Sequence, residues 1–180
     1  PMRKLEIGSG SRPQDGYEHL DLDPKCPHLE YVAPMDNIPV EDNTFSEVYS
    51  VHVIEHQSWR DTKKVLEEWY RVLAKEGTVY LATPNLKFIT EMYIDGMNGG
   101  DRWIKDYNIM HPEEQAHIRI NGIPNLAKWA NFKLYSSTGN GDVHYACLDS
   151  KSIIEIMKEI GFQEITIQSD TDSLVVRAKK

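Results

Sequence analysis

Two glycines and a carboxylate follow the first two apolar segments of the chain. Residues 4–7 form a short apolar run that ends at Gly8-Ser9-Gly10, and a second run ends at Asp21. A Gly-x-Gly turn after a strand lets the backbone approach a ligand without a Cβ in the way. A carboxylate at the end of the next strand can accept hydrogen bonds from both hydroxyls of a ribose. The order of these residues along the chain favours a ribose-binding site. The alternatives are that the glycines only form a tight turn and that Asp21 only caps a turn or a helix.

The glycine loop departs from two other nucleotide-binding patterns. Pro13 stands where the third glycine of G-x-G-x-x-G would be, and no lysine follows to complete a phosphate loop. A dinucleotide cofactor is therefore disfavoured.

A second group of polar residues, His52, Glu55 and His56, has the H-x-x-E-H spacing of a helical zinc peptidase. That chemistry requires a helix, whereas these residues fall where an apolar strand runs into a loop. We therefore expect no metal, and a structural or cofactor-flanking role for Glu55 and His56.

The apolar patterns predict the elements that position these residues. Short or continuous apolar runs predict strands over residues 4–7, 20–22, 29–33, 45–54, 78–82, 164–168 and 173–178. Apolar stripes at helical spacing predict a helix between Ser58 and Gly77, capped by Ser58 with Asp61, and another over 148–162 that stops at Gly161. Strands alternating with helices predict an α/β fold: a Rossmann-like, doubly wound, mostly parallel sheet with a C-terminal antiparallel hairpin whose turn is residues 170–172.

Ligands of such sheets bind beyond the carboxyl ends of the strands. This rule selects the loops 8–13, 21–24, 52–57 and 83–85. Residues 86–145 show weaker periodicity and begin at the carboxyl end of a predicted strand. We expect a single domain over 2–180 in which this insertion forms a cap on the substrate side, the alternative being an ordinary surface insertion.

Several linked motifs resemble class I S-adenosylmethionine-dependent methyltransferases of the type 11 kind, in a subgroup with a very short first crossover. They span nearly the whole chain outside residues 86–135: Glu6-Ile7-Gly8-Ser9-Gly10, Gly16-Tyr17-Glu18-His19-Leu20-Asp21, the stretch from Ile38 to Val48, His52-Val53-Ile54-Glu55-His56, the amphipathic helix and the closing helix. Asp21 follows Gly10 by only eleven positions, so a full first helix cannot fit between them.

The resemblance implies that the cofactor is S-adenosylmethionine and that the product is S-adenosylhomocysteine. It places Glu6, Gly8 and Gly10 at the methionine part and Asp21 at the ribose. Asp36 and Asn37 would flank the adenine, and the expected cofactor set also includes Ser9, Leu22 and His52. Some related methyltransferases hold a metal near this loop through acidic residues, but His52 stands where a carboxylate is expected there.

Methyl transfer to a small molecule or sugar, most plausibly at oxygen, is the function that this resemblance implies. A hydroxyl acceptor must lose its proton, and His144 and His56 are the candidate bases because imidazole titrates near neutral pH. For each, the alternative is a histidine that only caps or hydrogen-bonds at an element boundary. Tyr17, Asn85 and His111 are candidates for the acceptor site. Two other functions stay open: an inactive cofactor-binding sensor or partner subunit, and cleavage of S-adenosylmethionine.

Composition narrows the partners further. The formal charge of −8 and the pI near 5.3 argue against nucleic acid as a partner. Cys26 and Cys147 form no CxxC pair, which fits a reducing compartment. The sequence shows no membrane span and no signal-peptide pattern, so we expect a cytoplasmic protein with no membrane partner, and the oligomeric state stays open.

Overall fold

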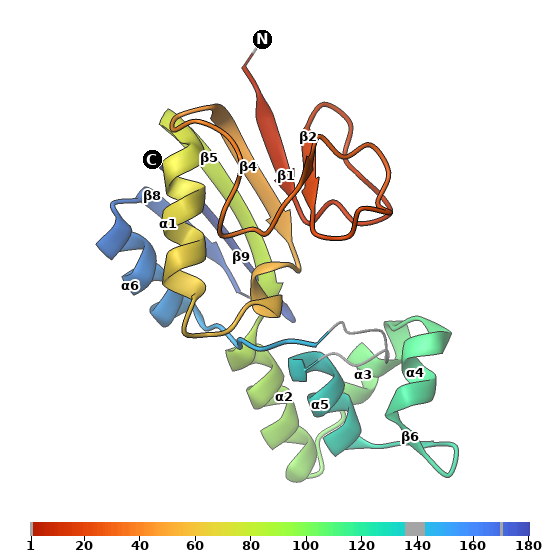
Figure 1. Cartoon of the computed structure of the whole chain (residues 1–180). Helices are drawn as coiled ribbons and strands as arrows, with labels where there is room; N and C mark the ends of the chain where they lie inside the picture. Colours follow the sequence, from red (N-terminus) through yellow and green to blue (C-terminus); the bar gives the residue numbers. More distant parts are fainter. Residues whose placement is uncertain (1, 136–142, 170) are drawn as a thin grey trace.

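The computed structural model describes residues 2–135, 143–169 and 171–180. Its main feature is a seven-stranded sheet in the order β3-β2-β1-β4-β5-β9-β8 (Figure 1). The strands are β1 (Lys4–Ile7), β2 (Glu18–Asp21), β3 (Tyr31–Val32), β4 (Phe45–Val51), β5 (Leu73–Pro84), β8 (Gln163–Gln168) and β9 (Ser173–Lys179). The first five pair in parallel, and β9 is antiparallel to both of its neighbours. The predicted α/β class and C-terminal hairpin are confirmed; residue 170 of its predicted turn lies outside the described residues.

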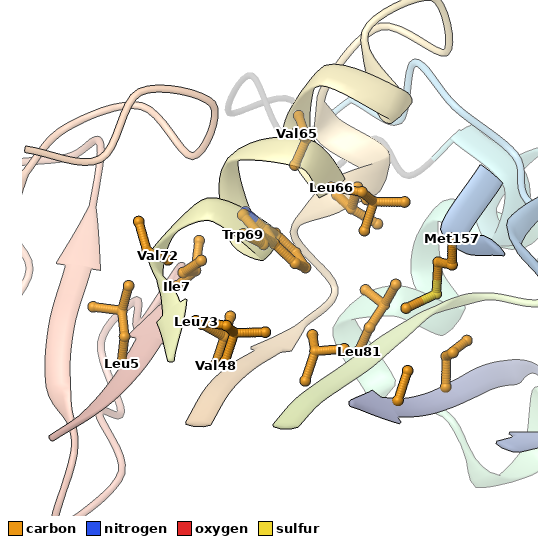
Figure 2. Close-up of a cluster of buried hydrophobic side chains, with 14 of the residues drawn as sticks. Leu5, Ile7, Val48, Val65, Leu66, Trp69, Val72, Leu73, Leu81 and Met157 are labelled. Atoms are coloured by element: carbon orange, nitrogen blue, oxygen red, sulfur yellow. The ribbon is translucent and has the colours of Figure 1, made fainter. Parts of the chain in front are cut away.

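Two helices, α1 (Thr62–Val72) and α6 (Ser150–Ile160), pack on one face of this sheet and close the main core. Figure 2 shows Leu5, Ile7 and Val48 of the strands beneath Trp69 of α1. All members of the predicted apolar stripe are fully buried: Val65, Leu66, Trp69 and Val72 lie on α1, and Leu73 is the first residue of β5. The Trp69 indole also donates from Nε1 to the carbonyl oxygen of Met35, 3.0 Å away, which attaches the loop after β3 to α1.

The predicted stop of α6 at Gly161 is confirmed, and the predicted stop of α1 at Gly77 is wrong. Asp149 caps α6 by accepting from the main-chain N–H of Lys151 and Ser152, and Gly161 ends it at a φ of 114°. By contrast, α1 ends at Val72 because β5 begins at the next residue, so Gly77 lies inside that strand. Asp61 stands at the N-cap of α1, but its side chain makes no capping hydrogen bond.

The predicted strand 45–54 is three residues shorter in the structure. It stops at Val51 because His52 takes a left-handed φ of 55°, which an extended strand does not allow. Residues Ile54–His56 then form the 3₁₀ turn η1. This break turns the side chains after β4 toward the carboxyl edge of the sheet.

Loops rather than helices join the first four strands. Residues 8–17, 22–30 and 33–44 contain no helix, which confirms that a first crossover helix does not fit. The helices therefore cover one face of the sheet, while the opposite face, with Tyr49, Tyr80 and Arg177, carries no helix among the described residues (Figure 1). There the Tyr49 and Tyr80 rings stack with centroids 4.8 Å apart, and the Arg177 guanidinium lies 4.8 Å from the Tyr80 ring.

The insertion folds around a second hydrophobic core beyond the carboxyl edge of the sheet (Figure 1). It contains α2 (Leu86–Met97), α3 (Arg102–Ile109), α4 (Pro112–Ile118), the hairpin of β6 (Arg119–Ile120) and β7 (Ile123–Pro124), and α5 (Leu126–Tyr135). Residues 136–142 of the predicted insertion lie outside the described part. Trp103, Tyr107 and Trp129 are among the buried side chains of this second core. The half-buried Lys133 ammonium attaches the insertion to the turn before β9: it is 2.8 Å from Asp172 of that turn and 3.0 Å from Asp106 of α3.

No helix in the described ranges is long and apolar enough to cross a lipid bilayer.

Candidate functional site

A cavity of about 420 Å³ opens at the carboxyl ends of β1 to β4, at the point where the strand order reverses between β1 and β4. Its volume lies in the range of small-molecule sites, and its position is the one where doubly wound sheets bind ligands. Seven of the residues singled out from the sequence line it: Gly8, Gly10, Asp21, Leu22, Asp36, His52 and His56. The tertiary structure therefore assembles these loops into one site.

The glycine loop is held in a conformation that a larger residue would disturb. Gly8 has a φ of 72°, and a Cβ added there would lie 2.2 Å from Cγ2 of Val53. The main-chain N–H of Gly8 donates to the carbonyl oxygen of Leu20 over 2.7 Å. Gly10 also has a positive φ, but an added Cβ would meet nothing within 4 Å. Gly8 thus brings the loop against the turn after β4, and Gly10 borders open space.

The Asp21 carboxylate fixes both this loop and the turn after its own strand. Oδ2 accepts from the N–H of Gly10 over 2.9 Å, and Oδ1 accepts from the N–H of Asp23 over 3.0 Å. An ionised carboxylate has about four acceptor positions, so two bonds leave room for ligand hydroxyls. Asp21 can therefore orient a ribose while it holds the loop.

Three residues of the apolar wall of the cavity were not predicted from the sequence, whereas Leu22 was. Ala33, Pro34 and Met35 line it directly after the short β3, and Leu22 faces it from the loop after β2 with 70% of its surface exposed. An apolar wall of this kind suits a purine ring. The signal that would have found these residues is their position at the carboxyl end of a parallel strand. Asp36 completes this wall, and its carboxylate is 2.7 Å from Nζ of Lys64.

Three residues of the predicted cofactor set lie outside the cavity lining. The buried Glu6 carboxylate accepts from the N–H of Gln14 over 2.8 Å and lies 3.0 Å from Nδ1 of His19. Ser9 is buried, and its Oγ has no hydrogen-bond partner among the described residues. Asn37 donates its main-chain N–H to Pro34 in a bend. The Glu6 carboxylate thus supports the glycine loop from beneath.

A cluster of titratable side chains lies beside the other end of the cavity. Glu55 is fully buried; its Oε1 is 3.0 Å from Nδ1 of His52 and 4.0 Å from Nε2 of His144, and its Oε2 accepts from the Thr83 hydroxyl over 3.2 Å. The His56 and His144 rings meet edge to face with centroids 5.0 Å apart. The hydrogen bond to Glu55 raises the pKa of His52 above its ordinary value, against the opposing effect of burial.

Main-chain hydrogen bonds bring His144 to this cluster from far along the chain. The N–H groups of Tyr145 and Ala146 donate to the carbonyl oxygen of Glu55 over 2.7 and 3.1 Å. The N–H of His144 donates to the carbonyl oxygen of Tyr135, at the end of α5. The pairing of His144 with Glu55 and His56 thus depends on the insertion being folded.

The three residues predicted for the acceptor lie elsewhere. The Tyr17 hydroxyl donates to Glu47 over 2.5 Å on the helix-free face of the sheet, where burial and this hydrogen bond raise its pKa. Asn85 caps α2, and its Nδ2 donates to the carbonyl oxygens of Ser169 and Thr171. His111 caps α4 in the insertion. None of the three lines the cavity.

A seven-stranded sheet of this order, with a glycine loop and an acidic residue at the ends of its first two strands, defines the class I methyltransferase fold. Residues 18–81 match the family Methyltransf_11, described as a methyltransferase domain. The chain therefore has the class I methyltransferase fold, and part of it, residues 18–81, matches a methyltransferase family.

Solved structures with the same fold match the chain over its whole length at low sequence identity. One from Thermotoga maritima, named as a possible histamine N-methyltransferase, is 14% identical with a TM-score of 0.65, covering 100% of this chain and 83% of that one. The 1,6-didemethyltoxoflavin N1-methyltransferase of Burkholderia thailandensis, with S-adenosylhomocysteine bound, is 12% identical with a TM-score of 0.59, covering 100% and 71%. A putative methyltransferase of Haloferax volcanii in complex with the Trm112 activator is 14% identical with a TM-score of 0.59, covering 99% and 82%. No curated protein matches the sequence.

Proposed function

We propose that the protein transfers the methyl group of S-adenosylmethionine to a hydroxyl oxygen of a small polar molecule, with sugars as the first acceptors to test. The observation that carries this proposal is the Glu55, His56 and His144 cluster beside the cavity, because a hydroxyl acceptor has to lose its proton and an imidazole of this cluster can accept it. The narrower sugar proposal rests on the resemblance to the short-crossover subgroup.

The residues present fit the cofactor. Asp21 has acceptor capacity left for the ribose hydroxyls, and the wall of Leu22, Ala33, Pro34 and Met35 suits the adenine. Gly10 leaves open space where a side chain would otherwise stand, which suits the methionine part. His52 and His56, at the remaining end, are then nearest to the acceptor.

When bound, the cofactor would supply a methyl group on a positively charged sulfur, as the group to be transferred to the acceptor oxygen. The loops after β1, β2 and β3 hold and orient this group, since in-line placement of the acceptor provides much of the acceleration. The cluster after β4 handles the proton: an imidazole Nε2 of His56 or His144 can accept it from the acceptor hydroxyl, and the buried Glu55 carboxylate stabilises the resulting positive charge.

Calorimetry with S-adenosylhomocysteine tests the cofactor site. We expect saturable binding by the wild type and a roughly 10- to 100-fold weaker affinity in Asp21→Asn, because a charge-assisted hydrogen bond contributes about 1.5–3 kcal/mol. Asp23→Asn is the matched control, since Asp23 lies two positions further on and does not line the cavity. Equal affinities in the two variants would remove Asp21 from the cofactor site.

A labelled methyl group tests the reaction. The protein is incubated with methyl-labelled S-adenosylmethionine and, in separate mixtures, with sugars and with amines, and the labelled product is identified. Label on a sugar oxygen is the expected result. Label on amines alone would refute oxygen transfer, and cofactor binding without transfer to any acceptor would indicate a binding protein.

A further inference from the structure

We infer that Glu55, His56 and His144 together bind a divalent transition-metal ion of the Zn²⁺ or Fe²⁺ type. Only the role of the ion rests on the proposed function, because that role is to bind the acceptor oxygen. The sequence indicated no metal, because the H-x-x-E-H spacing needs a helix to bring His52 and His56 together. In the structure, the second histidine of the cluster is His144, which comes from another part of the chain, and not His52.

The donor atoms are close enough for one ion. One ligand atom from each of the three residues lies within 4.8 Å of the other two, and the Glu55 Oε1 to His144 Nε2 distance is 4.0 Å. Zinc sites have ligand bonds of about 2.0–2.2 Å, which places their donors roughly 3.3 Å apart. Closing the site therefore requires side-chain movements of about 1 Å. Two imidazoles with one carboxylate favour zinc, iron, cobalt or manganese over calcium or magnesium.

Both imidazoles are oriented as metal ligands usually are. Nδ1 of His56 is 3.2 Å from the carbonyl oxygen of Val143, and Nδ1 of His144 is 3.1 Å from the carbonyl oxygen of Leu134. A carbonyl oxygen only accepts, so Nδ1 of each ring carries the proton and Nε2 is the basic nitrogen. Metal-binding histidines commonly donate their second N–H to a carbonyl in this way, which fixes the tautomer and the ring plane.

The charge of Glu55 supports the same conclusion. Its side chain has no exposed surface, and its contacts are the Thr83 hydroxyl and the imidazoles of His52 and His144. No lysine or arginine in the described part of the chain forms an ion pair with it. Burying a carboxylate is costly unless a positive charge accompanies it. A divalent cation between Glu55 and the two rings supplies that charge.

The position of the site gives the ion a role in the reaction. His56 lines the cofactor cavity, whereas Glu55 and His144 lie behind it, so an ion on the three groups would be at the end of the cavity assigned to the acceptor. Three protein ligands leave positions open for the acceptor, as in catalytic zinc sites. An acceptor with two adjacent oxygens would chelate the ion, which would lower the pKa of a bound hydroxyl. The two imidazoles would then act as ligands, and the ion would replace them as the means of activating the hydroxyl.

Cobalt(II) binding to the whole protein tests the site directly. The protein is treated with a chelator, dialysed and titrated with Co²⁺, and bound cobalt is followed by its visible absorption and by calorimetry. We expect one equivalent bound, competition by Zn²⁺, and at least about 100-fold weaker binding in His144→Ala and in His56→Ala, since even outer partners of metal ligands contribute 10- to 100-fold. His117→Ala is the matched control, because His117 is an exposed histidine of the insertion, in α4.

Binding of S-adenosylhomocysteine, measured on each variant, separates loss of the ion from loss of the fold. Retained cofactor binding with lost cobalt binding supports the site. Absence of stoichiometric cobalt binding to the wild type at millimolar Co²⁺ would overturn it, as would equal losses in His117→Ala and His144→Ala. Cobalt binding together with no methyl transfer to any hydroxyl would refute the proposed function and leave the metal site standing.

Discussion

Replacing Gly8 by alanine should destabilise the protein through one identifiable contact. A residue with a Cβ at the Gly8 φ of 72° costs about 1–2 kcal/mol. The added carbon would also lie 2.2 Å from Cγ2 of Val53, an overpacking that costs about 1–3 kcal/mol more. The expected loss is therefore about 2–5 kcal/mol, which for a chain of this length lowers Tm by roughly 5–15 °C.

A double-mutant cycle with Val53→Ala measures the contact separately from the backbone strain. Urea unfolding of the four proteins should show that Gly8→Ala costs only about 1–2 kcal/mol once the Val53 side chain is truncated, a coupling of about 1–3 kcal/mol. Gly16→Ala is the control, because Gly16 has a φ of 85° with nothing within 4 Å of an added Cβ. The reasoning is refuted if Gly8→Ala is as mild as Gly16→Ala, or equally costly with and without Val53.

Three further outcomes are expected. Gly10→Ala should match Gly16→Ala in unfolding free energy but bind S-adenosylhomocysteine at least about 10-fold more weakly, because its methyl group enters the cavity; equal affinities in calorimetry would exclude Gly10 from the site. Asn85→Ala should cost about 2–4 kcal/mol in urea unfolding, since a helix cap and two donated hydrogen bonds are lost; a loss below about 0.5 kcal/mol would contradict this. The Arg71 hydrogen bond holds the pKa of Glu68 below its ordinary value, so its stabilisation is present above the unfolded-state pKa of about 4.3 and is lost as pH falls through the folded value. Stability should therefore fall less steeply below pH ~4.3 in Glu68→Gln, and identical acid unfolding curves would count against it.

Helices and strands whose ends are marked by residues of their own segment were predictable. Helix α6 has a capping aspartate at one end and a glycine in the left-handed conformation at the other, and both signals are complete within its own segment. The start of β5 was not predictable in the same way. Gly77 is a plausible helix stop in isolation, but pairing of Leu73 with Phe45 of β4 ends α1 four residues earlier.

The part of the cavity that we propose for the cofactor was predictable for a similar reason. Gly8, Gly10 and Asp21 follow short strands, and parallel strands bring their carboxyl ends to one edge whatever the intervening loops do. The apolar wall at Ala33 to Met35 was not predicted, although the strand before it, observed as Tyr31–Val32, was expected over residues 29–33.

The cluster that we propose to face the acceptor depended on contacts that no local pattern carries. Sequence spacing associated Glu55 and His56 with His52, whereas main-chain hydrogen bonds from Tyr145 and Ala146 to Glu55 bring His144 to them. Tyr17 and Asn85, which look equally suited to an acceptor in the sequence, are used on the far face of the sheet and at a helix cap.

The sequence by itself determined the succession of strands along the chain, the glycine loop, its aspartate and the absence of a first crossover helix, because turns, periodicity and chain length are local properties. Only the tertiary structure decided which histidines meet the buried glutamate, because that choice depends on hydrogen bonds between segments far apart in the chain and on the folding of the insertion.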